Sequence, residues 1–191
     1  MNKHLSLIIV LVGLVGCTKA PALKVYSLNV APIKSAQSRT FNNKSIKVSY
    51  PQSLKEEMSQ KMNFSYSVSD RGSYQNSEWS NLMSKLLQGT FIEVIDSANI
   101  FKVVLSDTSS LKENYRLESN VYAFEHQVRG TQSHAIISVQ FTLINADVGK
   151  LVKSKRFFYK EETPTVNAQG YAQATNIAMT HLSRDLVGWL R

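Results

Sequence analysis

The chain has 191 residues, a length that suits one domain with a substantial hydrophobic core. Its single cysteine excludes an internal disulfide and a zinc site built from several thiolates. The formal charge of +8 favours an anionic binding partner, although basic residues that only solvate the surface would give the same total.

The N-terminal residues have the pattern of a bacterial lipoprotein signal. A basic head precedes an apolar run over residues 5–16, which is shorter than the roughly 20 residues that span a bilayer as a helix. The run ends in Leu14-Val15-Gly16-Cys17, which matches a lipobox. We therefore expect residues 1–16 to be removed and Cys17 to carry a diacylglycerol and an N-acyl chain, which together anchor a protein stably. The alternative is an ordinary thiol in an uncleaved apolar tail.

The residue after the cysteine bears on the location of the protein. By resemblance to enterobacterial lipoproteins, an aspartate there would favour the inner membrane, and this chain has Thr18. We expect an outer-membrane lipoprotein with a tether over residues 17–23 and a single periplasmic α+β domain over residues 24–191. An exported, anchored protein is not expected to bind nucleic acid, so the positive charge points to anionic lipid or an acidic partner.

The first half of the domain alternates strands and loops before one clear helix. A polar loop covers residues 31–44, one or two helical turns are compatible with residues 53–60, and a turn is expected at Asp70-Arg-Gly-Ser. Apolar residues spaced three and four apart predict a helix from Trp79 to Ile95, capped by Asn76 or Ser77. The strands expected before this helix cover residues 24–29, 45–50 and 62–68.

The second half predicts a meander and a closing helix. A short strand over residues 101–105 precedes three long ones, with turns at Gly130 and residues 147–149. Asn167 is expected to cap a helix that runs to about Leu190. The long strands cover about residues 115–128, 134–145 and 151–161. This order predicts an α+β two-layer sandwich, with a mostly antiparallel sheet and two main amphipathic helices on one face.

The sequence contains no recognisable catalytic or metal-ligand motif, so we expect no catalytic residues, no metal and no cofactor apart from the lipid. His126 and His134 flank the Gly130 turn, but two histidines without a third ligand make a weak metal site. The carboxylate pairs at residues 56–57 and 161–162 are expected to be solvated. The rival hypothesis is an envelope hydrolase that uses His126, His134 and Glu125.

The last long strand is strongly basic. It and its turn carry Lys150, Lys153, Lys155 and Arg156, with Lys153 and Lys155 on one face of a regular strand. These residues are candidates for contact with phospholipid head groups or with an acidic partner. The alternative is a charged edge strand that discourages pairing with other sheets.

The order of these features resembles the auxiliary lipoproteins of ABC-type transport systems, specifically the Pqi-type partners of MCE-domain proteins. The resemblance is carried by the lipobox, the strand with Tyr26-Ser27-Leu28, the segment Val48 to Leu54, and the helix that opens with Trp79 and Leu82. The family often has an arginine and a Trp-Ala-Glu-Pro-Leu-like run at that point, and this chain lacks the proline.

The resemblance implies a role without catalysis. Such a lipoprotein projects from the outer membrane into the periplasm and docks the MCE-domain protein and ABC permease complex that carries lipid between the two membranes. Contact with phospholipid and homo-oligomerisation would fit that role. A different expectation with the same fold class is an envelope assembly lipoprotein for polysaccharide, pilus or secretion machinery.

Overall fold

The computed structural model describes residues 21–33, 41–56 and 58–191. Cys17, the rest of the lipobox and part of the predicted polar loop lie outside these residues. The described chain forms, in order, β1 (Lys24–Tyr26), β2 (Ser45–Val48), β3 (Lys61–Ser65), β4 (Arg71–Trp79), α1 (Met83–Ser97), β5 (Val103–Ser106), β6 (Tyr115–Arg129), β7 (Gln132–Asn145), β8 (Lys150–Glu162) and α2 (Ala168–Leu190).

The strands form one mixed sheet, which corrects the mostly antiparallel sheet expected from the sequence. The meander β6–β7–β8 and the β3–β4 hairpin are antiparallel, as short turns require. The pairs β1–β4, β2–β5, β2–β6 and β3–β6 are parallel. Parallel pairs join strands that are distant in sequence, so the alternation within each strand could not reveal them.

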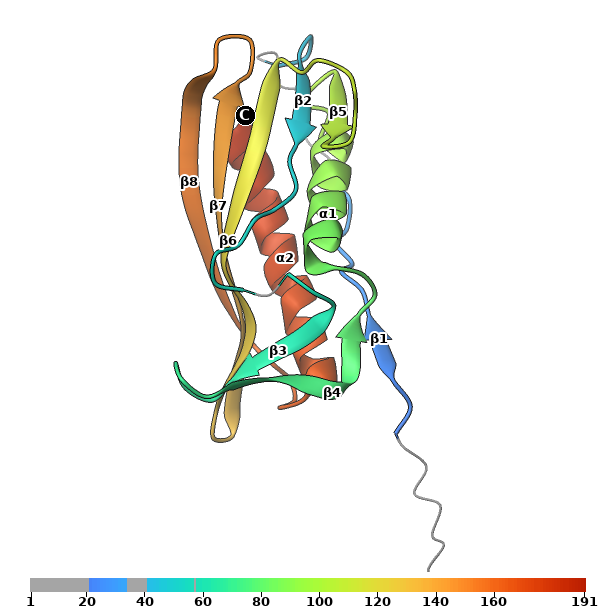
Figure 1. Ribbon diagram of the computed structural model, residues 1–191, viewed down its shortest axis with the longest axis vertical. Helices are drawn as coiled ribbons and strands as arrows, with labels where there is room; N and C mark the ends of the chain where they lie inside the picture. The colour runs from blue at the N-terminus through green and yellow to red at the C-terminus, as the bar shows by residue number, and fades with distance from the viewer. Residues whose placement is uncertain (1–20, 34–40, 57) are drawn as a thin grey trace, which may run out of the picture.

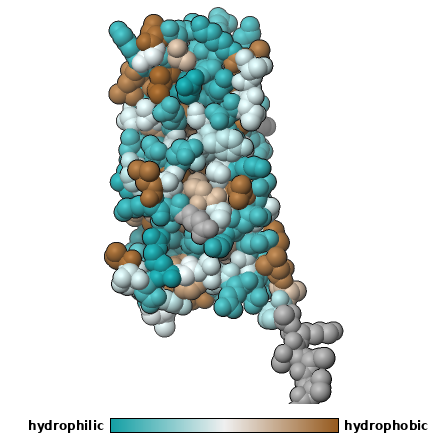
Figure 2. Space-filling model, viewed as in Figure 1, coloured by the Kyte–Doolittle hydropathy of each residue, from teal (hydrophilic) through white to brown (hydrophobic). Residues whose placement is uncertain are grey.

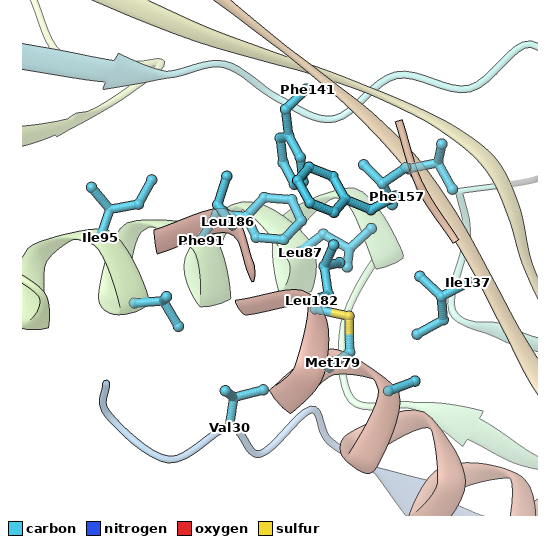
Figure 3. Packing of buried hydrophobic residues seen from close by; sticks show 14 of the residues in the cluster. Val30, Leu87, Phe91, Ile95, Ile137, Phe141, Phe157, Met179, Leu182 and Leu186 are labelled. Atoms are coloured by element: carbon cyan, nitrogen blue, oxygen red, sulfur yellow. The ribbon is translucent and has the colours of Figure 1, made fainter. Parts of the chain in front are cut away.

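Both helices pack on one face of this sheet, as expected. In Figure 1, α2 runs behind β6 and β7, with α1 beside it. Phe141 on β7 contacts Phe91 of α1 edge to face, with ring centroids 5.0 Å apart, and it also contacts Trp189 of α2. Figure 3 shows the core between the layers, with Leu182 and Leu186 of α2 beside Leu87 of α1. The architecture is therefore α+β, with one sheet covered by two helices.

The first helix begins later than the sequence predicts. Residues Arg71–Trp79 form strand β4, and α1 starts at Met83, with Leu82 as an N-cap that makes no side-chain hydrogen bond. The expected caps, Asn76 and Ser77, therefore lie in a strand. Trp79 is buried against Phe124 and Tyr171, so its apolar character reflects burial at the end of β4. The spacing between Trp79 and the next apolar residues matches the period of a helix, which is why the predicted helix began too early.

Two smaller expectations in this region are also wrong. The turn lies earlier than expected: the backbone amides of Tyr66 and Ser67 donate to Asp70 O, and Arg71 already belongs to β4. The described residues of segment 53–60 contain no helix. Instead, the Ser53 hydroxyl accepts the amides of Lys55 and Glu56, a local side-chain turn that competes with a helical one.

The meander and the closing helix match the expected bounds within a few residues. On β7 the residues Ala135, Ile137, Val139, Phe141 and Leu143 are all buried in the core, as the alternation predicts. The Asn167 side chain accepts a hydrogen bond from Gly170 N at 2.9 Å, which confirms the predicted cap of α2.

Gly170 is required by close packing in the first turn of α2. A Cβ added there would lie 2.1 Å from the carbonyl oxygen of Thr165 and 2.8 Å from its amide nitrogen. Backbone atoms cannot move aside as a flexible side chain can. The glycine therefore lets the loop after β8 fold back onto the helix.

His126 is a buried polar residue inside the core. Its Nδ1 lies 2.7 Å from the Tyr74 hydroxyl, and its ring stacks on Tyr171 with centroids 5.1 Å apart. Burial, with a smaller effect of His134, lowers the pKa of His126 to about 4. The imidazole is therefore held neutral as a packed aromatic ring.

We expect Gly170→Ala to lower the free energy of unfolding by about 1–3 kcal/mol or more, because the new methyl group overlaps the Thr165 backbone. The matched control is Gly89→Ala in α1, where a Cβ meets no atom within 4 Å. That change should stabilise the protein by about 0.5–1 kcal/mol through helix propensity. Urea unfolding of both variants measures the two effects, and equal shifts would contradict this account.

We also expect the stability to fall as the pH drops below about 6.5. Unfolded His126 takes up a proton near pH 6.5, whereas the folded state resists protonation until about pH 4. The free energy of unfolding should therefore decrease by about 2 kcal/mol between pH 7.5 and pH 5. His126→Phe should abolish this decrease, and the control His134→Gln should retain it. Urea unfolding at the two pH values measures this decrease. The same decrease in His126→Phe as in the unmodified protein would refute the assignment to His126.

Candidate docking surfaces

The histidines do not form a metal site. Strand register pairs His126 with Ala135 on the core side of the sheet, and pairs His134 with Gln127 on the opposite side. The two side chains therefore leave opposite faces and cannot share a metal ion. Across residues 21–33, 41–56 and 58–191, no cluster of three or more potential ligands is found. Within the same ranges, no helix has the length and apolar character needed to cross a membrane.

Strand β8 lies at an edge of the sheet. It pairs with β7 along one side and with no other described strand. Its exposed residues combine lysines with large apolar side chains, since Leu151 is 65% and Phe158 is 62% exposed. Lysine alone would protect such an edge, but exposed apolar side chains beside it are typical of surfaces that bind another protein.

Two of the four predicted basic residues lie on the core side of β8. Lys153 Nζ donates to the carbonyl of Trp189 at 2.5 Å and lies 5.1 Å from the centre of its ring. It therefore binds the C-terminal end of α2, where a cation is favourable, while burial lowers the pKa of Lys153. Lys155 shares this side and lies over Phe157 at 4.8 Å, but it remains exposed.

The other two occupy different positions. Lys150 is exposed at the start of β8, next to the β7–β8 turn. Arg156 projects from the open face of the sheet, where its guanidinium lies 4.0 Å over the ring of Tyr122 and its Nε donates to Ser138 Oγ at 2.8 Å. The four predicted residues therefore do not form one surface. Lys150, Lys153 and Lys155 belong to the β8 edge, and Arg156 lies on the open face of the sheet.

Arg156 lines a polar groove on the open face that local sequence patterns did not predict. The groove has a volume of about 290 Å³. Within it, Arg71 Nη2 binds both carboxylate oxygens of Glu56, at 2.9 and 3.0 Å, and Glu125 at 2.9 Å. Glu56, expected to be solvated, is buried by this contact. The lining includes Lys55, Ser65, Arg71, Tyr122, Glu125, Arg129 and Arg156.

This groove can bind an anion. The two carboxylates both bind Arg71, and no ion pair joins Arg129 or Arg156 to a carboxylate of the described chain. Arg129 Nη1 donates to the carbonyls of Ser65 and Val128, which leaves its other N–H groups available. Sequence reasoning missed the groove because its residues come from separate segments that meet only in the folded sheet.

Comparison with known proteins shows the same fold elsewhere. Protein XCC0632 from Xanthomonas campestris, with the family description DUF330, is 18% identical, has a TM-score of 0.74 and covers 87% of this chain and 94% of that chain. An uncharacterized protein is 13% identical with a TM-score of 0.69, over 90% and 100% of the chains. The hypothetical protein CT253 from Chlamydia trachomatis is 6% identical with a TM-score of 0.55, over 78% and 95%. No curated protein sequence matches significantly.

The family comparison is more specific. Residues 26–187 match the family described as the ABC-type transport auxiliary lipoprotein component. The match runs from the end of β1 to the last turn of α2, and so it includes both the β8 edge and the open-face groove. The chain therefore belongs to the family of ABC-type transport auxiliary lipoprotein components, which are bacterial envelope proteins that assist transport and are not a family of enzymes.

Proposed function

We propose that this protein is the docking subunit of an ABC/MCE-type system that carries lipid between the two membranes of the envelope. It is held at the periplasmic face of the outer membrane by acyl chains on Cys17 and acts by binding a partner, without catalysis. The observation that carries the proposal is the family match over residues 26–187, which spans nearly the whole described fold. The sequence resemblance to the Pqi-type lipoproteins supports the MCE-domain protein as the partner.

The β8 edge is the surface best suited to dock this partner. Figure 1 shows that the chain enters the fold at one end, through β1, and that the β7–β8 turn lies at the other end. An anchor before β1 therefore leaves the β7–β8 turn free to reach away from the membrane. Figure 2 shows apolar side chains at this far end of the molecule. Val148 in the β7–β8 turn and Leu151 at the start of β8 are both exposed.

The chemistry of this edge defines the partner surface. The free side of β8 can accept another strand through backbone hydrogen bonds, and exposed Lys150 and Lys155 favour an acidic partner. Leu151 and Phe158 supply apolar contact area. Lys153 is occupied at the end of α2, so its contribution is to position this edge.

Replacing Cys17 tests the anchor. Mass spectrometry of the native protein should find an N-terminal peptide that begins at Cys17 and carries a diacylglycerol and an N-acyl chain, with residues 1–16 removed. Cys17→Ser removes the thiol that the thioether requires, so this variant should retain its signal segment and carry no lipid. A native protein with an unmodified Cys17 thiol would contradict the proposed anchor.

Reversing the charge of two lysines along β8 tests the docking surface. We expect Lys150→Glu combined with Lys155→Glu to reduce co-purification of the MCE-domain protein at least tenfold, because like charges repel an acidic partner. Lys85→Glu on the exposed side of α1 is the matched control and should leave co-purification unchanged. Equal recovery with all variants would refute this surface. Recovery of polysaccharide, pilus or secretion proteins in place of transporter subunits would refute the proposed system.

A further inference from the structure

The end of the domain nearest the proposed anchor has its own exposed features. In Figure 1 the β3–β4 turn and the β6–β7 turn lie at the same end as the start of β1. Residues 17–23 separate Cys17 from β1, and an extended chain of that length spans at most about 25 Å. A lipid on Cys17 would therefore keep this end of the domain close to the membrane surface.

The β3–β4 turn presents unburied apolar side chains. Val68 is 96% exposed and Tyr66 is 52% exposed, although this turn is otherwise made of serines and Asp70. Figure 2 shows apolar atoms at the lower left, over this turn. Leu23 and Val25, at the start of the fold, are also more than half exposed. Tyrosine and aliphatic side chains of this kind suit the boundary between lipid head groups and acyl chains.

The open-face groove reaches the same turn. Ser67 and Val68 line it, together with Arg129, whose Nη1 donates to the carbonyl of Ser65 just before this turn. Since Arg71 is neutralised by Glu56 and Glu125, the uncompensated positive charge of the groove comes from the other basic residues. The guanidinium group matches the oxygens of a phosphate geometrically, and Arg129 is the arginine of this groove that lies at the end of the sheet near the β6–β7 turn.

We propose that this end of the domain makes a second contact with the membrane, in which Arg129 binds the phosphate of an anionic phospholipid and the β3–β4 turn enters the head-group layer. The inference rests on the lipid anchor of the proposed function. It assigns Arg129, beside the β6–β7 turn, to lipid, whereas Lys150 at the far end remains for the partner protein. The contact would fix the direction in which the β8 edge points.

The single cysteine makes this contact measurable in the full-length lipoprotein. Once Cys17 carries its thioether, Val68→Cys provides the only free thiol for a fluorescent label. The control label is placed by Val148→Cys, which is also exposed and lies in the β7–β8 turn at the far end. The lipoprotein is incorporated into nanodiscs of phosphatidylcholine alone or mixed with phosphatidylglycerol, and lipids with a head-group quencher report proximity to the membrane.

We expect the label at residue 68 to be quenched several-fold more than the label at residue 148, and more strongly with phosphatidylglycerol. Arg129→Gln should remove that dependence on phosphatidylglycerol. Lys150→Gln removes the same charge at the far end and should leave it unchanged. Circular dichroism confirms that each variant is folded. Equal quenching of the two labels, or quenching at residue 68 that depends neither on phosphatidylglycerol nor on Arg129, would overturn the proposal.

Two further measurements separate the alternatives. Calorimetric titration with inorganic phosphate tests a free-phosphate site; arginine-dependent binding there, without phosphatidylglycerol-dependent quenching, would rule out the membrane contact. The protein mass shows whether Cys17 is acylated. Should Cys17 carry no lipid, the same protein is sedimented with phosphatidylglycerol vesicles, and binding that does not require Arg129 would refute the contact. Neither measurement involves the transporter, so its result is independent of the proposed docking function.

Discussion

Strand β6 must satisfy hydrogen bonds to three neighbouring strands at once. One side pairs with β7 along its whole length, while the other pairs in parallel with β2 near Tyr115 and with β3 near His126. Between these two pairings, Ser49 N donates to Leu117 O and Val121 N donates to Gln52 O. The segment after β2 thus follows β6 and leaves few buried backbone groups without partners. This sharing makes the sheet mixed.

The same arrangement separates the basic residues of the chain. The strands carry Lys150 and Arg129 toward opposite ends of the molecule, as Figure 1 shows for the β7–β8 and β6–β7 turns. Carboxylates neutralise particular positions, such as Arg71 by Glu56 and Glu125. The composition gives only a net positive charge, and the fold distributes the basic residues over two surfaces of different chemistry. One is an open strand edge with apolar side chains, and the other is a polar groove beside an apolar turn.

Local patterns were reliable where one physical cause produced them. Strand β7 alternates because one face packs against helices, and Asn167 caps α2 because its short side chain reaches Gly170 N. The local patterns failed where a residue is buried by contacts with distant parts of the chain. Trp79 is buried at the end of β4, where it packs against Phe124 and Tyr171. Its spacing from the next apolar residues matches a helical period, so the predicted helix began too early, inside β4. His126, which looked like a possible ligand, is a core ring stacked on Tyr171.

The sequence by itself determined the lipobox pattern, the meander and the closing helix, since each depends on neighbouring residues or on a regular period of burial. Only the tertiary structure decided the parallel pairings, the grouping of Arg71 with Glu56 and Glu125, and the placement of Arg156 apart from Lys153. Periodicity reports which face of a strand is buried, but it contains no information on which distant strand lies beside it. The groove and the strand edge, where binding is proposed, exist because of those distant neighbours.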